Sequence, residues 1–197
     1  MLQGRITTEP DEVGIARALA DGFGVLAAQD DRQGIFPFRQ IEALHGAGLL
    51  ALTAPRAQGG RGAGLELTAR VIAEIGRGDP AVALILVMQY AHLALLNHGR
   101  WPSHLAGAVM RSAVEEGALI NALRVEPDLG TPLRGGLPAT TARRSGDGWR
   151  LSGSKIYSTG SEGLRWGIVW ARTDEAEPRV GQFLVPIGAE GVEIVPT

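Results

Sequence analysis

The chain has 197 residues, 45% of them hydrophobic and 20% charged, which is enough apolar material for one or two folded domains. Its 19 basic and 21 acidic residues give a formal net charge of -2, so charge offers no reason to expect a nucleic acid or an anionic membrane as partner. The absence of cysteine excludes disulfides, thiolate metal sites and cysteine nucleophiles, and it fits a reducing compartment.

No apolar segment of the secretory type follows the first residues, and we expect a cytoplasmic protein. The longest apolar run, 81–96, is broken by Gln89, Tyr90 and His92. Its uninterrupted parts are therefore shorter than the roughly 18 residues that a membrane span needs. We expect a buried helix in this region.

Helical periodicity extends to about residue 113. Apolar positions recur at steps of three and four residues, which is typical of helices with one buried face. The pattern is clearest at Leu65, Thr68, Ile72 and Ile75. Asp79-Pro80 predicts the start of a further helix, because Asp can cap free amides and Pro in the first turn lacks a donor that would be unpaired anyway. Trp101-Pro102 predicts the start of another.

From residue 118 the pattern changes to short stretches rich in Val, Ile, Thr and Trp, separated by Gly, Pro and Asp, which predicts strands. The stretches are 118–125, 139–145, 148–156, 166–173, 180–187 and 191–195. Their spacing favours an antiparallel barrel or sandwich. Asp147-Gly148 predicts a hairpin, and the last stretch is expected to leave an unpaired edge. We therefore predict an α+β fold, with a helical domain at 1–115 and a β-barrel-like domain at 116–197.

A glycine-rich segment, 54–62, lies between two helical patterns. Its glycine spacing does not match the dinucleotide fingerprint, and no strand precedes it, so by itself it predicts a plain connecting loop. The segment also resembles the acyl-CoA dehydrogenase family, whose members carry a Pro, a few residues and then Gly-Gly before an amphipathic helix like that expected at 64–78. The strongly apolar helix at 80–97 resembles the next helix of that family.

The second motif is Leu-Arg-Val-Glu-Pro-Asp-Leu-Gly-Thr at 123–131. It resembles the family signature Thr-Glu-Pro-x-x-Gly-Ser, which lies along a flavin. The resemblance implies that Leu123 and Val125 offer backbone groups to the isoalloxazine, and that Gly130 and Thr131 approach the phosphates. Val125 replaces the usual Thr and Pro132 the usual Asp. The alternative is an ordinary strand that ends in a Glu-Pro turn.

The third motif, Gly-Ser-Lys-Ile-Tyr-Ser-Thr-Gly at 153–160, resembles the family run Asn-Gly-x-Lys-x-Trp-Ile-Thr. The resemblance implies that Tyr157 is the aromatic residue beside the flavin and that the Thr159 hydroxyl meets flavin N5, with Ser158 between them as a further contact. An aromatic side chain there offers stacking area and excludes water. We expect Thr131 and Thr159 to face one shared groove.

Other chemistry is not indicated. The four histidines lie in helical stretches without metal-ligand spacing and are interpreted as packing or capping residues, so no metal site is predicted. The serines lack the context of a nucleophile elbow. In the family, the glutamate that removes the substrate's alpha proton comes from a carboxy-terminal four-helix bundle, and we expect a truncated chain without that bundle. No catalytic residue is assigned.

The resemblance implies a flavin-dependent oxidoreductase that dehydrogenates an acyl-CoA thioester with FAD as cofactor. Two alternatives remain open at this point: a flavin monooxygenase of the same fold, for which FMN is the expected cofactor, and a non-catalytic fragment. The expected partners are an acyl-CoA or other small molecule, together with a second copy of the chain or a chain that supplies the bundle. Neither a nucleic acid nor a membrane is expected as partner.

Overall fold

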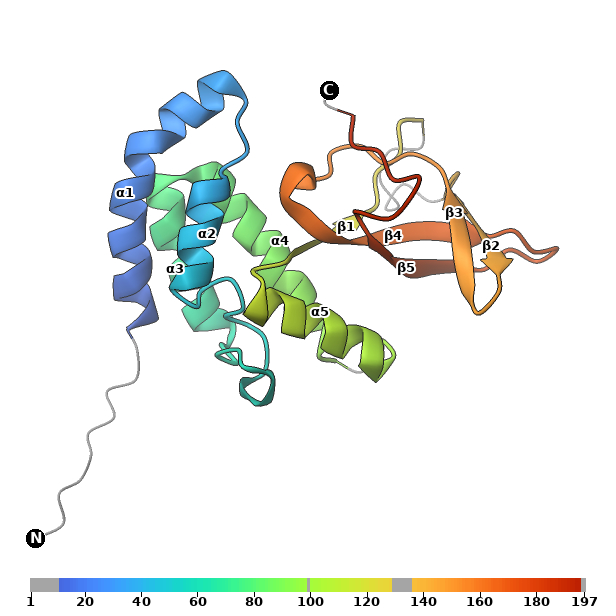
Figure 1. Cartoon of the computed structure of the whole chain (residues 1–197), viewed down its shortest axis with the longest axis horizontal. Helices are drawn as coiled ribbons and strands as arrows, with labels where there is room; N and C mark the ends of the chain where they lie inside the picture. The colour runs from blue at the N-terminus through green and yellow to red at the C-terminus, as the bar shows by residue number, and fades with distance from the viewer. Residues whose placement is uncertain (1–10, 99, 129–135, 196–197) are drawn as a thin grey trace, which may run out of the picture.

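The computed structural model describes residues 11–98, 100–128 and 136–195. A layer of helices is followed by a curled sheet, and the two lie against each other (Figure 1). The helices are α1 (Glu12–Gln33), α2 (Phe38–Gly46), α3 (Leu65–Gly78), α4 (Pro80–Leu96) and α5 (Ser103–Glu115), with short 3-10 turns η1 (Arg56–Gln58) and η3 (Ser161–Gly163). The predicted helical half is confirmed, and the segment 54–62 is a connecting loop.

Helix α4 occupies the centre of the molecule and begins where the sequence predicts. The Asp79 carboxylate accepts hydrogen bonds from Ala81 N at 3.0 Å and Val82 N at 3.1 Å, and Pro80 occupies the first helical position. Because α4 is apolar on most sides, it can be buried by the other helices and by the sheet together. Its residues pack in both core clusters and so help to join the two halves of the chain.

The sheet is built around one long central strand. Its strands are β1 (Leu119–Leu123), β2 (Thr141–Ser145), β3 (Gly148–Ser152), β4 (Leu164–Thr173) and β5 (Val180–Pro186). Along one edge of β4 lie β1 and then β2, with β3 beyond β2, and β5 lies along the other edge. Three of the four strand pairings involve β4, so it is the central strand of the sheet.

The sheet is mixed, whereas the spacing of the strands predicted an antiparallel one. Strands β1 and β2 both run parallel to β4, while β2–β3 and β4–β5 are antiparallel. Parallel pairing requires a connection of a dozen or more residues, and the segment 124–163 between β1 and β4 is long enough to return the chain to the same end. The predicted hairpin uses part of that connection.

The hairpin is confirmed, with its turn one residue earlier than predicted. Ser145 pairs with Gly148, so the loop residues are Gly146 and Asp147. Gly146 has the positive φ, at 58°, which a two-residue hairpin turn requires. The strand predicted at 191–195 is wrong. After β5 the chain turns, with Gly191 at φ 84° and Val192 N bonded to Ala189 O, so it leaves the sheet before it can pair.

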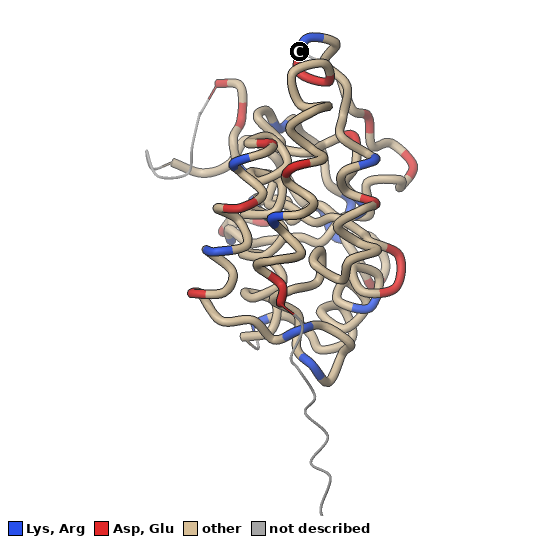
Figure 2. Tube along the Cα trace, turned by 90° about the vertical axis from the view of Figure 1, so that its left-hand side faces the viewer, with Lys and Arg blue, Asp and Glu red and all other residues tan. Residues whose placement is uncertain are grey.

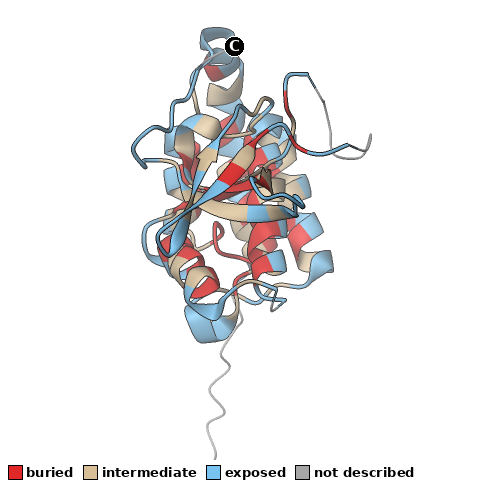
Figure 3. Cartoon of the chain, turned by 90° about the vertical axis from the view of Figure 1, so that its right-hand side faces the viewer, coloured by how far each residue is buried: buried red, intermediate tan, exposed pale blue. Residues whose placement is uncertain are grey.

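The buried core is shared between helices and strands, as the red segments behind the sheet show in Figure 3. One cluster packs α1 to α4 against Leu119 and Leu164, and a second packs α4 and α5 against Ile120 and Ile168. The last helix before the sheet ends at Glu115 and β1 begins at Leu119. Because both clusters cross this point, the division at 115/116 stays a prediction of domain organisation.

Charges on the face formed by α1 are mixed in sign (Figure 2). Arg17 bonds to Glu74 and Arg77 to Asp21, each at 2.6 Å, which ties α1 to α3 across solvent-exposed positions. Within the described part of the chain, no helix has the length and apolar character that a membrane crossing needs.

Candidate functional site

The two sequence motifs meet just beyond the end of β1. Ile156 N donates a hydrogen bond to Val125 O at 3.0 Å, so the segment that leaves β1 lies directly beside the segment that leaves β3. Val125 and Ile156 are 31 positions apart in the chain, so this contact is made by the tertiary structure. The Val125 carbonyl is thereby occupied, and among the described residues its amide has no acceptor.

A buried ion pair joins the same two segments. Lys155 Nζ donates to Glu126 Oε1 at 2.7 Å and to the Trp170 carbonyl of β4 at 2.6 Å. The side chains of Lys155 and Glu126 are only 7% and 5% exposed. A charge this deeply buried is stable only when it is paired and hydrogen-bonded, so each residue requires the other.

Glu126 also organises the start of β2. Its carboxylate accepts from Ala139 N at 2.7 Å, Thr140 N at 2.9 Å and the Thr140 hydroxyl at 2.5 Å. Burial by itself would raise the pKa of Glu126, but the hydrogen bonds from Lys155, from the Thr140 side chain and from the two backbone amides outweigh it and hold the pKa at about 2. Glu126 is therefore a permanent anion with a structural role.

Tyr157 is held in a conformation that its residue type disfavours. Its φ is 53°, and it is the one non-glycine residue with positive φ in the described ranges. Its side chain is 86% exposed, so burial of the ring does not compensate for the backbone strain. Strain of this kind persists where surrounding structure imposes it, and it is concentrated at ligand sites.

The loop after Tyr157 is fixed from two sides. Thr159 N donates to Tyr157 O at 3.1 Å, and the Asn121 side chain of β1 donates to Thr159 O at 3.0 Å. From the helical half, the Phe36 ring lies directly against Gly163, where it leaves no room for a Cβ. No described residue pairs with the hydroxyl groups of Ser158 and Thr159, which are both half-buried and therefore available to a ligand.

Side chains of α4 bind the free edge of β1. Gln89 is buried, accepts from Ile120 N at 2.8 Å and donates to Ala118 O at 3.1 Å. One turn later, His92 Nε2 accepts from Ala122 N at 3.2 Å. The helix therefore supplies hydrogen-bond partners to the backbone of β1 on the edge where no strand pairs with it. It also helps to set the position of β1, which leads into the site.

His92 is a neutral acceptor in this arrangement. Burial lowers the pKa of His92 most, the positive charge of Arg124 lowers it further, and a hydrogen bond with Asn121 acts in the opposite direction. The interpretation of this histidine as a packing residue is consistent with its place in the structure. His45 is also structural, since its Nε2 lies 3.0 Å from Val114 O and must donate to it.

Of the seven candidate flavin contacts, five lie in the described structure. Leu123 ends β1, Val125 follows it, and the loop after β3 contains Tyr157, Ser158 and Thr159. The hydrogen bonds from Ile156 and Asn121 bring these two groups together. Gly130 and Thr131 lie outside the described residues, so the groove shared by Thr131 and Thr159 stays a prediction.

Sequence reasoning missed the residues that support the site. Glu126 and Lys155 were both inside the motifs, but their opposite charges, 29 positions apart, gave no reason to pair them. In the sequence, Gln89 only interrupts an apolar run, which gives no direct sign of its contacts with β1. A polar side chain inside a helix that is otherwise apolar on all sides is the signal that could have indicated a buried hydrogen-bond role.

The described residues contain no group of three or more His, Asp or Glu side chains placed to hold a metal ion. What the site does offer is backbone, hydroxyl groups, one exposed aromatic ring and a fixed loop. This set is suited to a large planar organic ligand with polar edges.

Comparison with known proteins identifies the family. Residues 15–100 match the family model for the acyl-CoA dehydrogenase, N-terminal domain. YdbM of Bacillus subtilis (strain 168), which carries the name of an acyl-CoA dehydrogenase, is 32% identical over 179 residues, 91% of this chain and 47% of YdbM. The chain belongs to the acyl-CoA dehydrogenase family. The human mitochondrial short-chain specific acyl-CoA dehydrogenase is 34% identical over 176 residues, 86% of this chain and 41% of the human protein.

Solved structures confirm the fold of this acyl-CoA dehydrogenase relative. FMN-bound TdsC from Paenibacillus sp. A11-2 has a TM-score of 0.81 at 23% identity, over 92% of this chain and 45% of TdsC. KijD3 in complex with dTDP has a TM-score of 0.80 at 28% identity, over 91% of this chain and 46% of KijD3. The α+β architecture predicted from the sequence is therefore confirmed. The chain spans about half the length of the curated relatives it matches.

Proposed function

We propose that this chain forms the flavin-contacting part of an oxidoreductase that dehydrogenates an acyl-CoA thioester between its alpha and beta carbons. The observation that carries the proposal is the hydrogen bond between Ile156 N and Val125 O, which places the two flavin-type motifs side by side. The strained, exposed Tyr157 in the second motif is the residue expected to lie beside the flavin ring.

The residues present fit a flavin. The Val125 amide and the Thr159 hydroxyl, which no described residue engages, would hold polar edges of the ring, with Leu123 contributing backbone and Ser158 a second hydroxyl. Bound flavin would supply the acceptor for a hydride. Donors aimed at the ring stabilise the negative charge that develops on it, and Tyr157 would exclude water from one side.

Each supporting contact has a part in this proposal. The Asn121 side chain donates a hydrogen bond to the backbone carbonyl of Thr159 and would so orient the Thr159 hydroxyl. Lys155 ties the loop after β3 to Glu126. Gln89 and His92 fix β1 from α4. None of these residues takes a proton from a substrate, and no catalytic base is assigned among the residues of this chain.

A monooxygenase of the same fold is the second candidate. It is favoured by the FMN complexes among the structural neighbours. One of them is the complex of KijD3 with FMN and a dTDP-linked amino sugar, and KijD3 is 26% identical to this chain. The dehydrogenase proposal predicts a preference for FAD and a shift of the flavin absorption band when butyryl-CoA is added. The monooxygenase alternative predicts a preference for FMN and no response to the thioester.

Flavin titration tests the shared part of both candidates. We expect saturable quenching of flavin fluorescence by the purified chain, and an affinity at least about fivefold lower for Thr159→Val, which removes one hydroxyl hydrogen bond and keeps the side-chain shape. Ser152→Ala, at an exposed position on β3, is the matched control and should bind as the original chain does. Equal affinities for Thr159→Val and the control would contradict the assignment of Thr159.

A further inference from the structure

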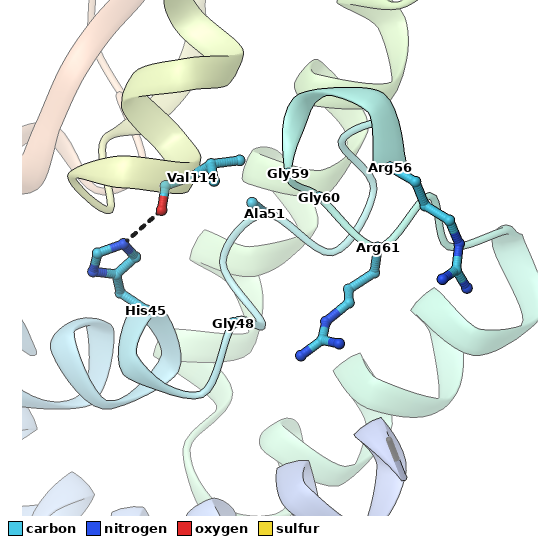
Figure 4. Close-up of a pocket in the computed structure, with 8 residues that line it drawn as sticks. All are labelled: His45, Gly48, Ala51, Arg56, Gly59, Gly60, Arg61 and Val114. Carbon is cyan, nitrogen blue, oxygen red and sulfur yellow. Dashed lines mark hydrogen bonds between the residues drawn. The ribbon is translucent and has the colours of Figure 1, made fainter. Parts of the chain in front are cut away.

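A cavity of about 360 Å³ lies in the helical half, between the end of α2, the loop that contains η1 and the end of α5 (Figure 4). The flavin-type motifs lie elsewhere, at the junction of β1, β3 and β4. None of the eight residues that line the cavity is acidic, and two of them are arginines, Arg56 and Arg61. The lining therefore contains cationic side chains and no acidic one.

Arg61 lies beside the carboxyl end of α2, and no described acidic side chain neutralises it. Its guanidinium lies close to Gly48, just past the end of α2, where a Cβ would come within 3.2 Å of an Nη atom. The carbonyl end of a helix attracts a cation, which accounts for the position of the group. Within the ranges that the structure describes, Arg61 has neither an ion pair nor a hydrogen bond. A half-buried guanidinium in this state keeps all five of its donors available.

The loop that presents Arg61 is rigid. At Gly60 a Cβ would collide with the Ala54 carbonyl, and at Gly59, where φ is 87°, it would meet Val114 at 2.9 Å. Gly60 N donates to Pro55 O and Gly62 N to Ala54 O, at 3.1 and 2.8 Å, so the loop closes on itself. Close backbone packing of this kind requires glycine and keeps the loop in one conformation.

The opposite walls are rigid as well. The hydrogen bond from His45 Nε2 to Val114 O joins α2 to α5 at one side of the cavity, as the dashed line in Figure 4 shows. In the same view, the side chains of Arg56 and Arg61 extend from the loop to the same side. A ligand would therefore meet the Arg61 guanidinium beside backbone segments that these hydrogen bonds already hold together.

We propose that this cavity binds the phosphate group of a small phosphorylated molecule, with Arg61 as the donor. Phosphate is the chemistry that best matches a planar guanidinium with several free donors. A volume of about 360 Å³ also lies at the lower end of the range for small-molecule pockets and exceeds the space that a bare anion fills. The proposal is independent of flavin binding, because none of its residues belongs to the flavin-type motifs.

The test uses the 197-residue chain without added flavin and three probes: inorganic phosphate, AMP and adenosine. Two-dimensional NMR spectra of the ¹⁵N-labelled chain should show saturable shifts at Gly48, Gly59 and Gly60 with phosphate or AMP and none with adenosine. Tighter binding of AMP would indicate a phosphomonoester ligand, and equal binding would indicate free phosphate. Shifts confined to the β half, or a response to adenosine equal to that to AMP, would overturn the proposal.

A charge-matched pair of variants gives the second readout. Arg61→Gln should weaken phosphate binding by at least about tenfold, the effect of losing a charge-assisted hydrogen bond. Arg70→Gln, at an exposed position on α3 outside the cavity, removes the same charge and should leave binding unchanged. Equal affinities in the two variants would mean that phosphate responds only to net charge, and the site would be refuted. If Arg61→Gln does not fold, the location of the shifts in the original chain decides the question.

Discussion

At the scale of single residues, the most consequential contact is the ion pair between Lys155 and Glu126. It is almost completely buried, and it connects the loops that leave β1 and β3 to the start of β2 and to the middle of β4. Exposed pairs such as Arg143–Asp174 contribute little to stability, because water competes for both partners. The buried pair is different, since neither partner can be removed without leaving the other uncompensated.

We expect Lys155→Met to lower the free energy of unfolding by about 3–5 kcal/mol, the range for breaking a buried ion pair. The matched variant Arg143→Met breaks an exposed pair and should cost less than about 1 kcal/mol. Urea unfolding followed by tryptophan fluorescence measures both. Comparable losses in the two variants would show that the Lys155 pair is not buried in solution.

Protonation of Glu126 gives a prediction about pH. Its pKa is about 2 in the folded chain against an ordinary value of 4.5, so its contribution to stability is complete above pH 4.5 and is lost as the pH falls toward 2. The difference in the free energy of unfolding between the original chain and Glu126→Gln should therefore shrink over this range. Because both chains carry the other carboxylates, their contribution to the pH dependence cancels in this difference. A difference that stays constant from pH 6 to pH 3 would contradict the ionised state assigned to Glu126.

At the scale of elements, α4 acts as the neighbour of β1. Its hydrogen bonds to the strand come from Gln89 and His92 on one face, while its apolar residues fill both core clusters. The helix thus fixes both the distance and the register of β1, which in turn leads into the flavin-type motif.

The Gln89→Leu variant tests this arrangement. It keeps the volume of the side chain but leaves the Ile120 amide and the Ala118 carbonyl without partners, at a cost of roughly 1–3 kcal/mol for each. We expect the Ile120 amide to exchange its hydrogen faster, measured by NMR. Gln33→Leu, at the exposed end of α1, is the control and should alter neither stability nor exchange at Ile120. Unchanged exchange in Gln89→Leu would show that the strand is held without the helix.

Several elements were predictable because their signals are local. The capping of α4 by Asp79, the strands around the hairpin and the loop at 54–62 all depend on residues a few positions apart. The two features that were predicted wrongly share a cause. The direction of β1 relative to β4, and the failure of 191–195 to pair, depend on where a distant part of the chain runs. Periodicity along a strand is the same in parallel and antiparallel neighbours when one face is buried, so it does not distinguish them.

At the scale of the whole molecule, apolar surface remains exposed on α4. Leu84 is 49% and Leu95 55% exposed, and a spacing of eleven residues puts both on one side of the helix. Val192, Ile194 and Val195 add exposed apolar area in the segment after β5, although that segment is not the strand edge that was predicted. Exposed apolar side chains that gather on one surface commonly mark a protein interface.

We expect the chain to self-associate through this face of α4. Burying apolar surface gains about 25 cal/mol per Å², so covering two leucines and their neighbours favours association at moderate concentrations. Light scattering over a concentration series should show a rising mass. The double variant Leu84→Glu with Leu95→Glu should stay monomeric, and Arg70→Glu on the exposed face of α3 should behave as the original chain. A chain that is monomeric at high concentration would show that this surface is stable in water.

The sequence by itself determined the family, the helical half followed by strands, and the two motifs, because caps, turns, periodicity and short signatures are encoded in neighbouring residues. Only the tertiary structure decided the mixed order of the sheet, the pairing of Glu126 with Lys155, the role of Gln89 and the strain at Tyr157. The cavity beside Arg61 also belongs to this group. The ion pair, the contacts of Gln89 and the cavity each bring together residues that are far apart in the chain, and neighbouring residues do not encode such approaches.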